Sequence, residues 1–367
     1  MANEFLSNAK RNKNDEFYTQ WVDIESEVQA YLEFDPNVFR EKTILCPCDD
    51  PEWSNFTKFF ALHFKEYGLK KLISTSYAPE SKANKEDYQI TLFELNDPKF
   101  DESKTNTHGK IFILDSKDIN KDGIINIDDL QWDYMNGDGD FRSEEVMKLR
   151  DEADIIITNP PFSLFREFLT WILDAEKQFL IVSNMNAITY KEVFPLIKYD
   201  CMWMGLAFGR SFKGFIIPKS YPLSGSEARI DEHGNHIVST NSTIWFTNLD
   251  HGRRHQPLPL MTMSDNLKFS KHEKIKDKVS YARYDNYDAI EVPYTDAIPS
   301  DYNGVMGVPI SFLNKYCPEQ FEIIGASDNG AVPDWFKLPH FKKHNEPYVN
   351  NKKLYKRIFI KHKGAVK

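Results

Sequence analysis

The sequence predicts an α/β fold, with an open, doubly wound, Rossmann-like sheet followed by a smaller α+β region. An apolar, β-branched run at residues 43–48 precedes a helical pattern at 55–67 and a second such run at 71–77, which is the order expected of a parallel strand pair with a right-handed crossover. The runs at 154–158 and 179–183 are continuously apolar, as in central strands buried on both faces. Strands that alternate with helices in this way specify a doubly wound sheet.

Other elements are predicted from local patterns along the chain. Apolar residues at helical spacing predict a first helix over 21–32, after a polar N-terminal arm. Two short apolar runs, at 88–95 and 110–114, are strand candidates within an otherwise polar stretch. Ser163 is a suitable N-cap for a helix over 163–176.

The length and texture of the chain predict two domains. A chain of 367 residues suits one large α/β domain and a smaller module. Beyond about Asp200, Pro, Gly, His and Asn separate short strand-like runs, which predicts that the sheet has ended. We therefore expect one domain at 1–205, with an acidic insertion at about 78–135, and a second region at 206–367.

Charge is distributed unevenly along the chain. The formal net charge is −9, which is not the usual charge of a nucleic-acid-binding protein. Residues 331–367, however, hold nine Lys and one Arg against two acidic residues, so this segment carries +8 and the rest of the chain −17. A basic end of this kind can bind phosphates while the acidic remainder stays in solution. A solvated basic tail is the alternative interpretation.

The cysteines and the N-terminus indicate a reduced, cytoplasmic protein. Four cysteines in a chain of this size are not a disulfide framework, and Cys46 and Cys48 lack partner Cys or His at zinc spacing. We expect these two side chains to share one face of a strand and to act in packing. The first 17 residues lack an apolar signal core, and no run approaches the length of a membrane span, so no membrane partner is expected.

The sharpest local motif is Asn159-Pro160-Pro161-Phe162, directly after the predicted strand at 154–158. The two prolines stop the sheet, because neither can donate a ladder hydrogen bond. Ligands bind at the C-terminal ends of strands in open α/β sheets. A rigid turn there can aim the Asn159 amide and the Pro160 carbonyl at one point, with the flat face of Phe162 beside it. An ordinary strand-ending Asn with a double proline is the alternative interpretation.

This geometry suits methylation of the exocyclic N6 amine of adenine. The amine is a poor nucleophile because its lone pair is delocalised into the ring. The Asn159 side-chain oxygen and the Pro160 carbonyl can accept both amine hydrogens and draw the nitrogen toward tetrahedral geometry, so that preorganised dipoles replace a base. Phe162 can stack on a base extruded from the duplex, which chemistry on a base usually requires.

The first strand-to-helix turn, at residues 46–56, is a candidate cofactor turn. It contains Pro47, Asp49 and Asp50 but no glycine, so it is not the phosphate cradle of a G-x-G-x-x-G loop. S-adenosylmethionine has no phosphates and carries a cationic amino group and a sulfonium, which carboxylates suit better than a nest of amides. Two Asp before a helix also suit its N-terminus, and that alternative stays open on this segment alone.

Nine segments spread along the chain carry a family resemblance. They are DEFYTQ from Asp15, CDDPEWSNF from Cys48, GDGDFRSEE from Gly137, TNPPFSLFREF from Thr158, NMNAITYKEVFPLI from Asn184, TNLDHGRR from Thr247, YDNYDAIEV from Tyr284, GVMGVPISFL from Gly304 and YKRIFIK from Tyr355. Over nearly its whole length the chain resembles the adenine-specific DNA methyltransferases of the EcoRI-modification type. The NPPF motif is shared by many amino-methyltransferases, whereas the CDDP and GDGDFRS segments are much more specific.

The resemblance implies roles for the matching residues. It implies that S-adenosylmethionine is bound by Phe17, Tyr18, Thr19, Pro47, Asp49, Asp50 and Asp140. The first three residues would close as an arm over the methionine end, the turn would use Asp49 or equally Asp50, and Asp140 would reach the adenine ring. Residues 159–162 would hold the target base. The glycine-rich cofactor loop of many methyltransferases is missing and no acidic residue ends the second strand, so the contact to the ribose stays open.

A calcium-loop spacing is also present. Asp118, Asn120, Asp122, Asn126 and Asp129 occupy positions 1, 3, 5, 9 and 12 of such a loop, with glycine at position 6. The last of these ligands is Asp where an EF-hand prefers Glu, as in the dockerin variant. A turn-rich insertion without metal is the alternative, and methyl transfer requires no metal in either case.

Basic side chains of the C-terminal region are the candidates for DNA contact. They are Arg253, Arg254, His255, Lys352, Lys353, Lys356 and Arg357. Lys and Arg supply phosphate affinity, and Arg also reads guanine edges. Each alone is compatible with an ordinary surface charge, so the interpretation rests on their clustering.

Together these observations predict a two-part enzyme. A seven-stranded, mostly parallel methyltransferase sheet over roughly the first 200 residues would bind S-adenosylmethionine and flip adenine, and a C-terminal target-recognition module would read double-stranded DNA. A cognate restriction endonuclease is compatible with this interpretation, with no stable complex implied. The alternatives are methylation of an RNA base or a protein amide nitrogen, and a catalytically idle DNA-binding protein.

Overall fold

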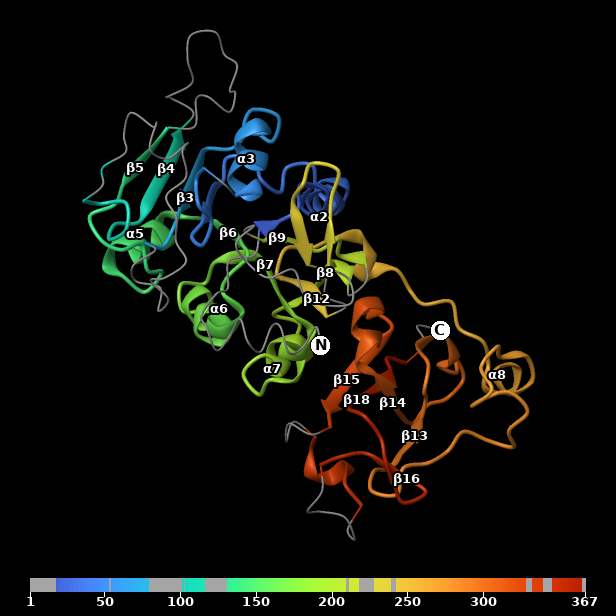
Figure 1. The fold of residues 1–367 in the computed structure, drawn as a ribbon. Coiled ribbons are helices and arrows are strands. Elements are labelled where there is room, and N and C mark those ends of the chain that lie inside the picture. Colours follow the sequence, from blue (N-terminus) through green and yellow to red (C-terminus); the bar gives the residue numbers. More distant parts are fainter. Residues whose placement is uncertain are drawn as a thin grey trace. The chain divides into compact units, whose positions relative to one another are not determined.

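The structure is a computed structural model of the chain. It describes residues 18–52, 54–78, 101, 103–115, 131–208, 211–217, 228–238, 242–327, 332–338 and 345–364. The chain divides into two compact units (Figure 1). Unit 1 comprises Met1–Met185 and Gly205–Leu249, and unit 2 comprises Asn186–Met204 and Asp250–Lys367.

The main sheet has eight strands in the order β5-β4-β3-β2-β6-β7-β12-β8 within the described residues. They are β2 (Thr43–Cys46), β3 (Lys71–Thr75), β4 (Lys110–Asp115), β5 (Trp132–Tyr134), β6 (Ile155–Thr158), β7 (Gln178–Asn184), β8 (Trp203–Phe208) and β12 (Thr243–Thr247). The central strands β3, β2, β6 and β7 are parallel. β4 and β5 extend the sheet by antiparallel pairing at one end, and β12 pairs antiparallel with β7. The mixed α/β class and the parallel β2–β3 pair were both predicted.

Two expectations about this sheet are wrong. Among the described residues the sheet has eight strands where seven were expected, and three of its strand pairs, β3–β4, β4–β5 and β7–β12, are antiparallel. The sheet also continues past the boundary expected at residue 205, because β12 belongs to it and every residue of β12 is buried. The reason is that a short apolar run shows that a strand is buried but not which sheet it joins, since strand pairing depends on distant residues.

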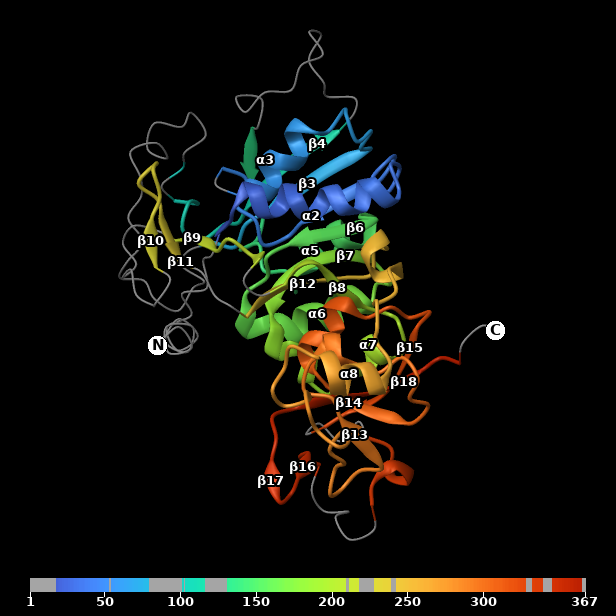
Figure 2. The same cartoon turned by 90° about the vertical axis from the view of Figure 1, so that its right-hand side faces the viewer.

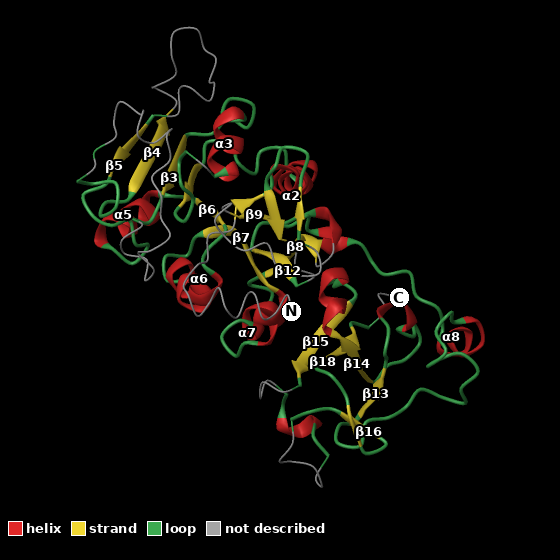
Figure 3. Ribbon diagram, viewed as in Figure 1, coloured by secondary structure: helices red, strands yellow, loops and turns green. Residues whose placement is uncertain are grey.

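Helices cover both faces of the main sheet, with α2 and α3 on one face and α5 and α6 on the other (Figures 1 and 3). Their bounds are α2 (Trp21–Phe34), α3 (Asn55–Leu62), α5 (Glu144–Glu152) and α6 (Phe165–Leu173). On the α2 and α3 face, the rings of Phe56 and Trp245 meet edge-on at 5.8 Å and are both completely buried. Burial of such aromatic side chains is the main stabilisation of this layer.

The predicted N-cap at Ser163 is wrong. A 3-10 helix occupies Phe162–Leu164, and α6 begins only at Phe165 without a side-chain cap. The Leu164 amide donates to the Pro161 carbonyl at 2.9 Å, so the chain leaves the double proline in the tighter helical form.

A second sheet carries the N-terminal arm. Its order is β1-β9-β11-β10, and all three pairs are antiparallel. The strands are β1 (Tyr18–Thr19), β9 (Phe215–Ile217), β10 (Arg229–Ile230) and β11 (His236–Val238). Figure 2 shows β9, β10 and β11 standing beside the main sheet of the same unit.

Unit 2 contains a mixed sheet of order β13-β14-β18-β15 and a separate β16–β17 hairpin. The elements are α7 (Phe194–Lys198), α8 (Met263–Phe269), β13 (Ala289–Glu291), β14 (Val305–Pro309), β15 (Phe321–Ala326), β16 (Tyr348–Val349), β17 (Lys352–Lys353) and β18 (Arg357–His362). Its core includes the buried rings of Tyr287, Phe336 and Phe359. The unit thus has an apolar core of its own.

The remaining predictions have mixed outcomes. Cys46 and Cys48 do not share a strand face, because β2 ends at Cys46 and Cys48 lies in the turn beyond it; both thiols are free. The arm residue Phe17, the strand candidate at 88–95 and the calcium-loop residues Asp118, Asn120, Asp122 and Asp129 lie outside the described residues. Within the described part of the chain, no helix combines the length and apolar character that crossing a membrane requires.

Candidate active site

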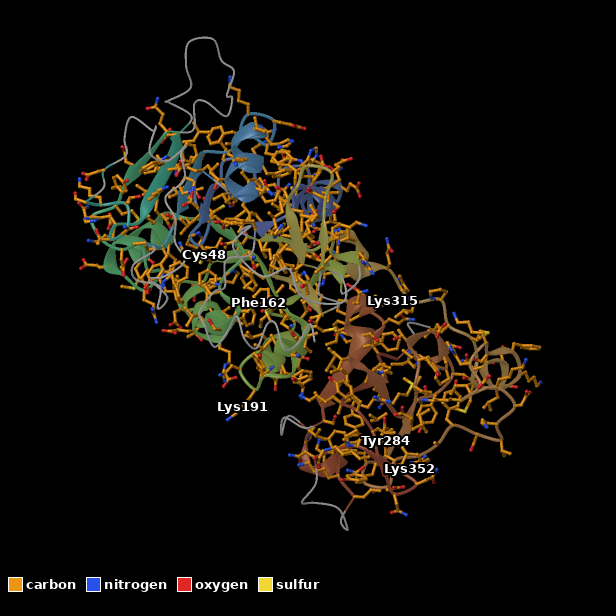
Figure 4. All side chains as sticks on the ribbon, viewed as in Figure 1. Cys48, Phe162, Lys191, Tyr284, Lys315 and Lys352 are labelled. Carbon is orange, nitrogen blue, oxygen red and sulfur yellow. The ribbon has the colours of Figure 1, made fainter. Side chains whose placement is uncertain are left out.

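Three turns meet where the parallel strands β2, β3 and β6 end. The turn after β2 contains Asp49, whose backbone N–H donates to the Thr75 carbonyl at the end of β3, at 3.0 Å. The Thr158 hydroxyl at the end of β6 donates to the Asp49 carboxylate. Figure 4 labels Cys48 and Phe162, which lie on the first and third of these turns. Two motifs separated by more than 100 residues in the sequence are therefore joined by a direct hydrogen bond.

The Asp49 carboxylate is buried and accepts hydrogen bonds at both oxygens. Its Oδ1 accepts from the Ser54 hydroxyl at 2.7 Å, and its Oδ2 accepts from Thr158. The residue is only 6% exposed. Burial raises the pKa of Asp49 to about 7, and the nearby charge of Asp50 adds to this, although the two hydroxyl groups act in the opposite direction.

Hydroxyl groups shape the turn that glycines form in many nucleotide-binding loops. The Ser74 hydroxyl donates to the Asp49 carbonyl at 2.6 Å, and the Thr75 hydroxyl donates to the Pro47 carbonyl at 3.2 Å. Ser74 also shares a hydrogen bond of 2.6 Å with Thr57 of α3. The end of β3 therefore holds the backbone of the cofactor turn.

The second carboxylate of the turn has a cationic neighbour. Asp50 accepts from the Glu52 amide at 2.9 Å and lies 4.0 Å from the Lys110 ammonium group. Lys110 also forms an ion pair with Glu52, and its ammonium lies 4.5 Å from the centre of the Trp132 ring. Asp50 is thus half-buried beside a fixed positive charge.

The loop that carries Asp140 packs against the end of β3 at backbone distance. Gly139 has a φ of +78°, and a Cβ there would lie 2.0 Å from the Ser76 carbonyl oxygen. A Cβ on Gly109 would lie 2.5 Å from the same oxygen. The Asp138 carbonyl accepts from the Ala78 amide at 2.7 Å. Only glycine permits this approach, which explains the second glycine of the GDGD segment, Gly139, and also Gly109.

Asp140 is held by Arg142 and lies near the cofactor turn. The Arg142 guanidinium contacts the Asp140 carboxylate at 2.5 Å and that of Glu167 at 3.3 Å. Burial alone would raise the pKa of Asp140, but the hydrogen bonds from Arg142 lower it below its usual value. Burial raises the pKa of the Cys48 thiol, and the charges of Asp49 and Asp140 raise it further.

The turn after β6 presents the predicted groups at the end of a fully buried strand. The side-chain oxygen of Asn159 is buried. Among the described residues, no donor is recorded on the Pro160 carbonyl, whereas the Pro161 carbonyl accepts from Leu164. The half-buried Phe162 ring meets Phe215 edge-on, with centroids 5.9 Å apart.

The N-terminal arm reaches the same group of residues. Thr19 pairs with Phe215, the residue that contacts Phe162. The Asn55 amide at the start of α3 donates to the Thr19 carbonyl at 2.8 Å. The Thr19 hydroxyl is buried and has no hydrogen-bond partner among the described residues. Because an unsatisfied buried hydroxyl is costly, this group fits a polar ligand at the site.

Sequence reasoning did not identify Thr158, Ser54, Ser74 or Thr75 as part of the site. All four are buried hydroxyl residues at strand ends or at the start of a helix. The available signal was that small hydroxyl residues flank the acidic turn and directly precede Asn159.

Two of the predicted DNA-binding arginines are held by carboxylates of unit 2. Arg254 is 8% exposed, forms ion pairs with Asp200 and Asp250, and stacks over Trp203 at 3.7 Å. Arg357 contacts the Glu291 carboxylate at 2.7 Å, and both side chains are largely buried.

The other predicted basic residues of unit 2 are more accessible. Lys352 and Lys353 are exposed, and Lys353 pairs with Glu346 at 2.8 Å (Figure 4 labels Lys352). The half-buried Lys356 donates to the Thr189 hydroxyl at 2.9 Å. Arg253 lies half-exposed in the 3-10 turn Gly252–His255. The predicted cluster therefore divides into buried arginines and more exposed cations.

Comparison with known proteins identifies the family. A family model described as "Adenine-specific methyltransferase EcoRI" matches residues 5–363. The chain belongs to this family. It is 44% identical to the Type II methyltransferase M.EcoRI of Escherichia coli over 100% of this chain and 98% of the relative. It is 33% identical to M.MgeORF184P of Mycoplasma genitalium, over 97% and 98%, and 32% identical to M.MpnI of Mycoplasma pneumoniae, over 99% and 99%. Both are also named Type II methyltransferases, and no solved structure matches the chain.

Proposed function

We propose that this chain is a site-specific DNA methyltransferase that transfers a methyl group from S-adenosylmethionine to the N6 amine of adenine. The observation that carries the proposal is the Asn159–Phe162 turn. It follows a strand buried at all four positions, and it is hydrogen-bonded through Thr158 to the acidic turn after β2. Membership of an adenine-specific methyltransferase family supports the same reaction.

The proposed catalytic groups are two oxygen acceptors and an aromatic ring. The Asn159 side-chain oxygen and the Pro160 carbonyl accept hydrogen bonds from the two N–H groups of the adenine amine and hold the nitrogen near tetrahedral geometry. Pro161 keeps the turn rigid, and Phe162, braced edge-on by Phe215, offers its face to the extruded base. S-adenosylmethionine, when bound, would supply the methyl group from its sulfonium and leave as S-adenosylhomocysteine, while the amine would release one proton to water. This chemistry uses fixed dipoles and requires no metal.

The proposed cofactor pocket is formed by the N-terminal arm, the turn after β2 and the GDGD loop. The buried Thr19 hydroxyl, which has no hydrogen-bond partner among the described residues, fits a polar ligand at this edge of the sheet. Phe17, Tyr18 and Thr19 would cover the methionine end, as the resemblance implies. Pro47 and Asp50 would line the turn, and Asp140 would face the adenine ring.

Unit 2 is proposed to contact double-stranded DNA. It carries 21 Lys and Arg against 16 Asp and Glu, whereas unit 1 carries 25 against 39. Arg253, Lys352, Lys353 and Lys356 remain candidates for phosphate contact. Arg254 and Arg357 are instead proposed to stabilise unit 2, because carboxylates already hold their guanidinium groups.

The biological setting follows as a further part of the proposal. The relatives carry Type II names, which supports a restriction-modification role with a cognate endonuclease that needs no stable complex with this chain. With chromosomal DNA as substrate, the enzyme would act in the cytoplasm.

The test is methyl transfer from labelled S-adenosylmethionine to unmethylated genomic DNA, with the modified nucleoside identified by mass spectrometry. We expect N6-methyladenine from the wild type, and a loss of at least 10²–10³-fold from Asn159→Ala with cofactor affinity retained. Methyl transfer to RNA or protein but not to DNA would overturn the proposal that DNA is the substrate. Binding of DNA without any methyl transfer would favour a catalytically idle DNA-binding protein.

A further inference from the structure

We propose that Asp49 is a positioning residue that joins the cofactor turn to the catalytic turn through the Thr158 hydroxyl, rather than a direct ligand of the cofactor. This inference rests on the proposed function and changes the role that the family resemblance implied for Asp49. It also adds Thr158 and Ser54 to the residues on which the reaction depends.

The contacts of Asp49 connect three elements of the sheet edge. Its carboxylate binds the hydroxyl of Ser54, whose oxygen also accepts from the Phe56 amide at the start of α3 at 3.0 Å. Its other oxygen binds Thr158, the residue directly before Asn159. Its backbone binds the end of β3, by donation to Thr75 and acceptance from Ser74. Asp49 thus holds the ends of β3 and β6 and the start of α3 in one arrangement.

This arrangement leaves little of the carboxylate for a ligand. Each oxygen already accepts a hydrogen bond from a protein hydroxyl, and the residue is only 6% exposed. The same arrangement gives Asp49 control over geometry, because a shift of Thr158 moves the Asn159 oxygen. A displacement of about 1 Å in a positioned catalytic group can lower the rate by about 10²-fold.

The test compares Thr158→Val, Thr158→Ser and Asp49→Asn in the full-length protein. Thr158→Val removes the hydroxyl with little change in volume, and Thr158→Ser retains it. We expect Thr158→Val and Asp49→Asn to lower kcat by roughly 10–10²-fold while the Kd for S-adenosylmethionine, measured by calorimetry, changes by less than about twofold. Thr158→Ser should keep kcat within about threefold of the wild type.

Two further readouts separate positioning from other roles. The double variant Asp49→Asn/Thr158→Val should be about as slow as the slower single variant, because both changes remove the same connection. Wild-type kcat in Thr158→Val would overturn the proposal, and so would loss of cofactor binding in Asp49→Asn alone. If Asp49→Asn does not fold, Thr158→Val and Thr158→Ser still decide the question. An inactive wild type would instead contradict the proposed function.

A separate observation in unit 2 supports a second proposal. We infer that the segment 268–278, at the end of α8 and beyond it, is a contact surface for DNA phosphates; this also rests on the proposed function. Its five lysines are Lys268, Lys271, Lys274, Lys276 and Lys278, and all are exposed. The segment contains only two acidic residues, so it carries +3. Among the described residues, the recorded ion pairs of these lysines are limited to Lys271 with Asp296 at 2.8 Å.

The backbone that carries these lysines is fixed. The Asp277 amide donates to the Leu267 carbonyl at 2.8 Å, and Ile275 is buried. The ring of His272 stacks on Tyr294 at 3.7 Å and binds Asp296 at 2.7 Å. Cations on a rigid backbone lose little backbone entropy when they bind phosphates. By contrast, Lys353 and Arg357 in the predicted C-terminal cluster already have carboxylate partners.

The test measures DNA binding by Lys274→Gln/Lys278→Gln with a fluorescent 40-base-pair duplex over a range of salt concentrations. The control is Lys65→Gln/Lys70→Gln, which removes two exposed lysines of unit 1. The slope of log K against log salt should become shallower by about 0.9 for each lost phosphate contact, with affinity roughly tenfold weaker at low salt, in the unit 2 variant only. Equal slopes for the variant and the wild type would overturn the proposal. Failure of the wild type to bind DNA would contradict the proposed function instead.

Discussion

The two units differ in how they hold their buried carboxylates, although unit 1 also contains a buried cation, Lys110, which pairs with Glu52. In unit 1, the buried carboxylates of Asp23 and Asp49 accept hydrogen bonds from backbone amides or hydroxyl groups. In unit 2, the buried Glu291 carboxylate is matched by the largely buried Arg357, and the buried Arg254 by Asp200, at ion-pair distance. A carboxylate held by neutral donors has a raised pKa when burial dominates, whereas a matched ion pair keeps both charges. The stability of unit 1 should therefore respond to pH, and that of unit 2 to loss of a partner.

The largest expected effect tests the ion-pair half of this comparison. Arg357→Met leaves the Glu291 carboxylate buried beside the Tyr284 hydroxyl without its cation, and should lower the free energy of unfolding of unit 2 by about 3–5 kcal/mol. Arg357→Met/Glu291→Leu should recover much of this loss. Urea denaturation followed by the fluorescence of the unit's aromatic residues measures both. Equal stability of the single variant and the wild type would remove the distinction between the units.

The second effect is the pH dependence of unit 1. Burial raises the pKa of Asp49 to about 7 and that of Asp23 to about 6, both above the ordinary value of 3.8. A carboxyl whose folded pKa is raised stabilises the fold fully below its unfolded pKa, and this contribution is lost as the pH rises through the folded pKa.

The measurement is unfolding of the wild type, Asp49→Asn and Asp23→Asn in urea from pH 4 to pH 8. The wild type should lose stability from about pH 4 to about pH 7. In Asp49→Asn, the loss of unfolding free energy that continues to about pH 7 should disappear. In Asp23→Asn, the loss that ends near pH 6 should disappear. Each loss is of the order of a few kcal/mol. Unchanged curves in both variants would contradict the assignment of buried, proton-binding carboxylates to unit 1.

A smaller effect concerns the salt response of unit 2. Lys352→Gln removes an exposed cation that has no ion-pair partner among the described residues. It should weaken binding of the 40-base-pair duplex by roughly threefold and make the salt slope shallower by about 0.9. Lys65→Gln in unit 1 is the control and should leave both quantities unchanged. Equal losses in the two variants would show that unit 2 has no special share in DNA binding.

The smallest effect separates surface pairs from buried ones within unit 2. Lys353 and Glu346 are 2.8 Å apart, but their side chains are 56% and 34% exposed. Lys353→Gln should change the free energy of unfolding by less than about 0.5 kcal/mol in the urea experiment, because solvent screens exposed ion pairs. A change as large as that of Arg357→Met would mean that burial does not decide the strength of these pairs.

Much of unit 1 could be predicted because its signals are local. The apolar runs that became β2, β3, β6 and β7 have the bounds expected to within a few residues, and the β2–β3 pair is parallel. The first helix begins at Trp21, as predicted. The Ser163 cap was wrong because the two preceding prolines impose a 3-10 turn before α6 can begin. The N-cap prediction considers one residue, whereas the two prolines restrict the backbone conformation of several following residues.

The candidate site was predicted in its parts but not in its connections. Asn159 was expected after a buried strand, and the structure has it there. The hydrogen bond from Thr158 to Asp49 joins residues 109 positions apart, and nothing local in either segment indicates it. The pairing of Arg357 with Glu291 likewise joins residues 66 positions apart. Because Glu291 holds the Arg357 guanidinium, Arg357 is no longer a candidate for DNA contact.

The sequence by itself determined the α/β class, the strand that precedes Asn159, and the membership of a methyltransferase family. Hydrophobic runs and prolines act on neighbouring residues, and family motifs can be compared directly between sequences. Tertiary structure alone decided that β12 extends the main sheet, that Asp49 faces Thr158, and that Arg254 and Arg357 are matched by carboxylates. The physical reason is that burial and hydrogen-bond partners depend on residues brought together from distant parts of the chain. A charged residue looks the same in the sequence whether its side chain contacts solvent, DNA or a buried carboxylate.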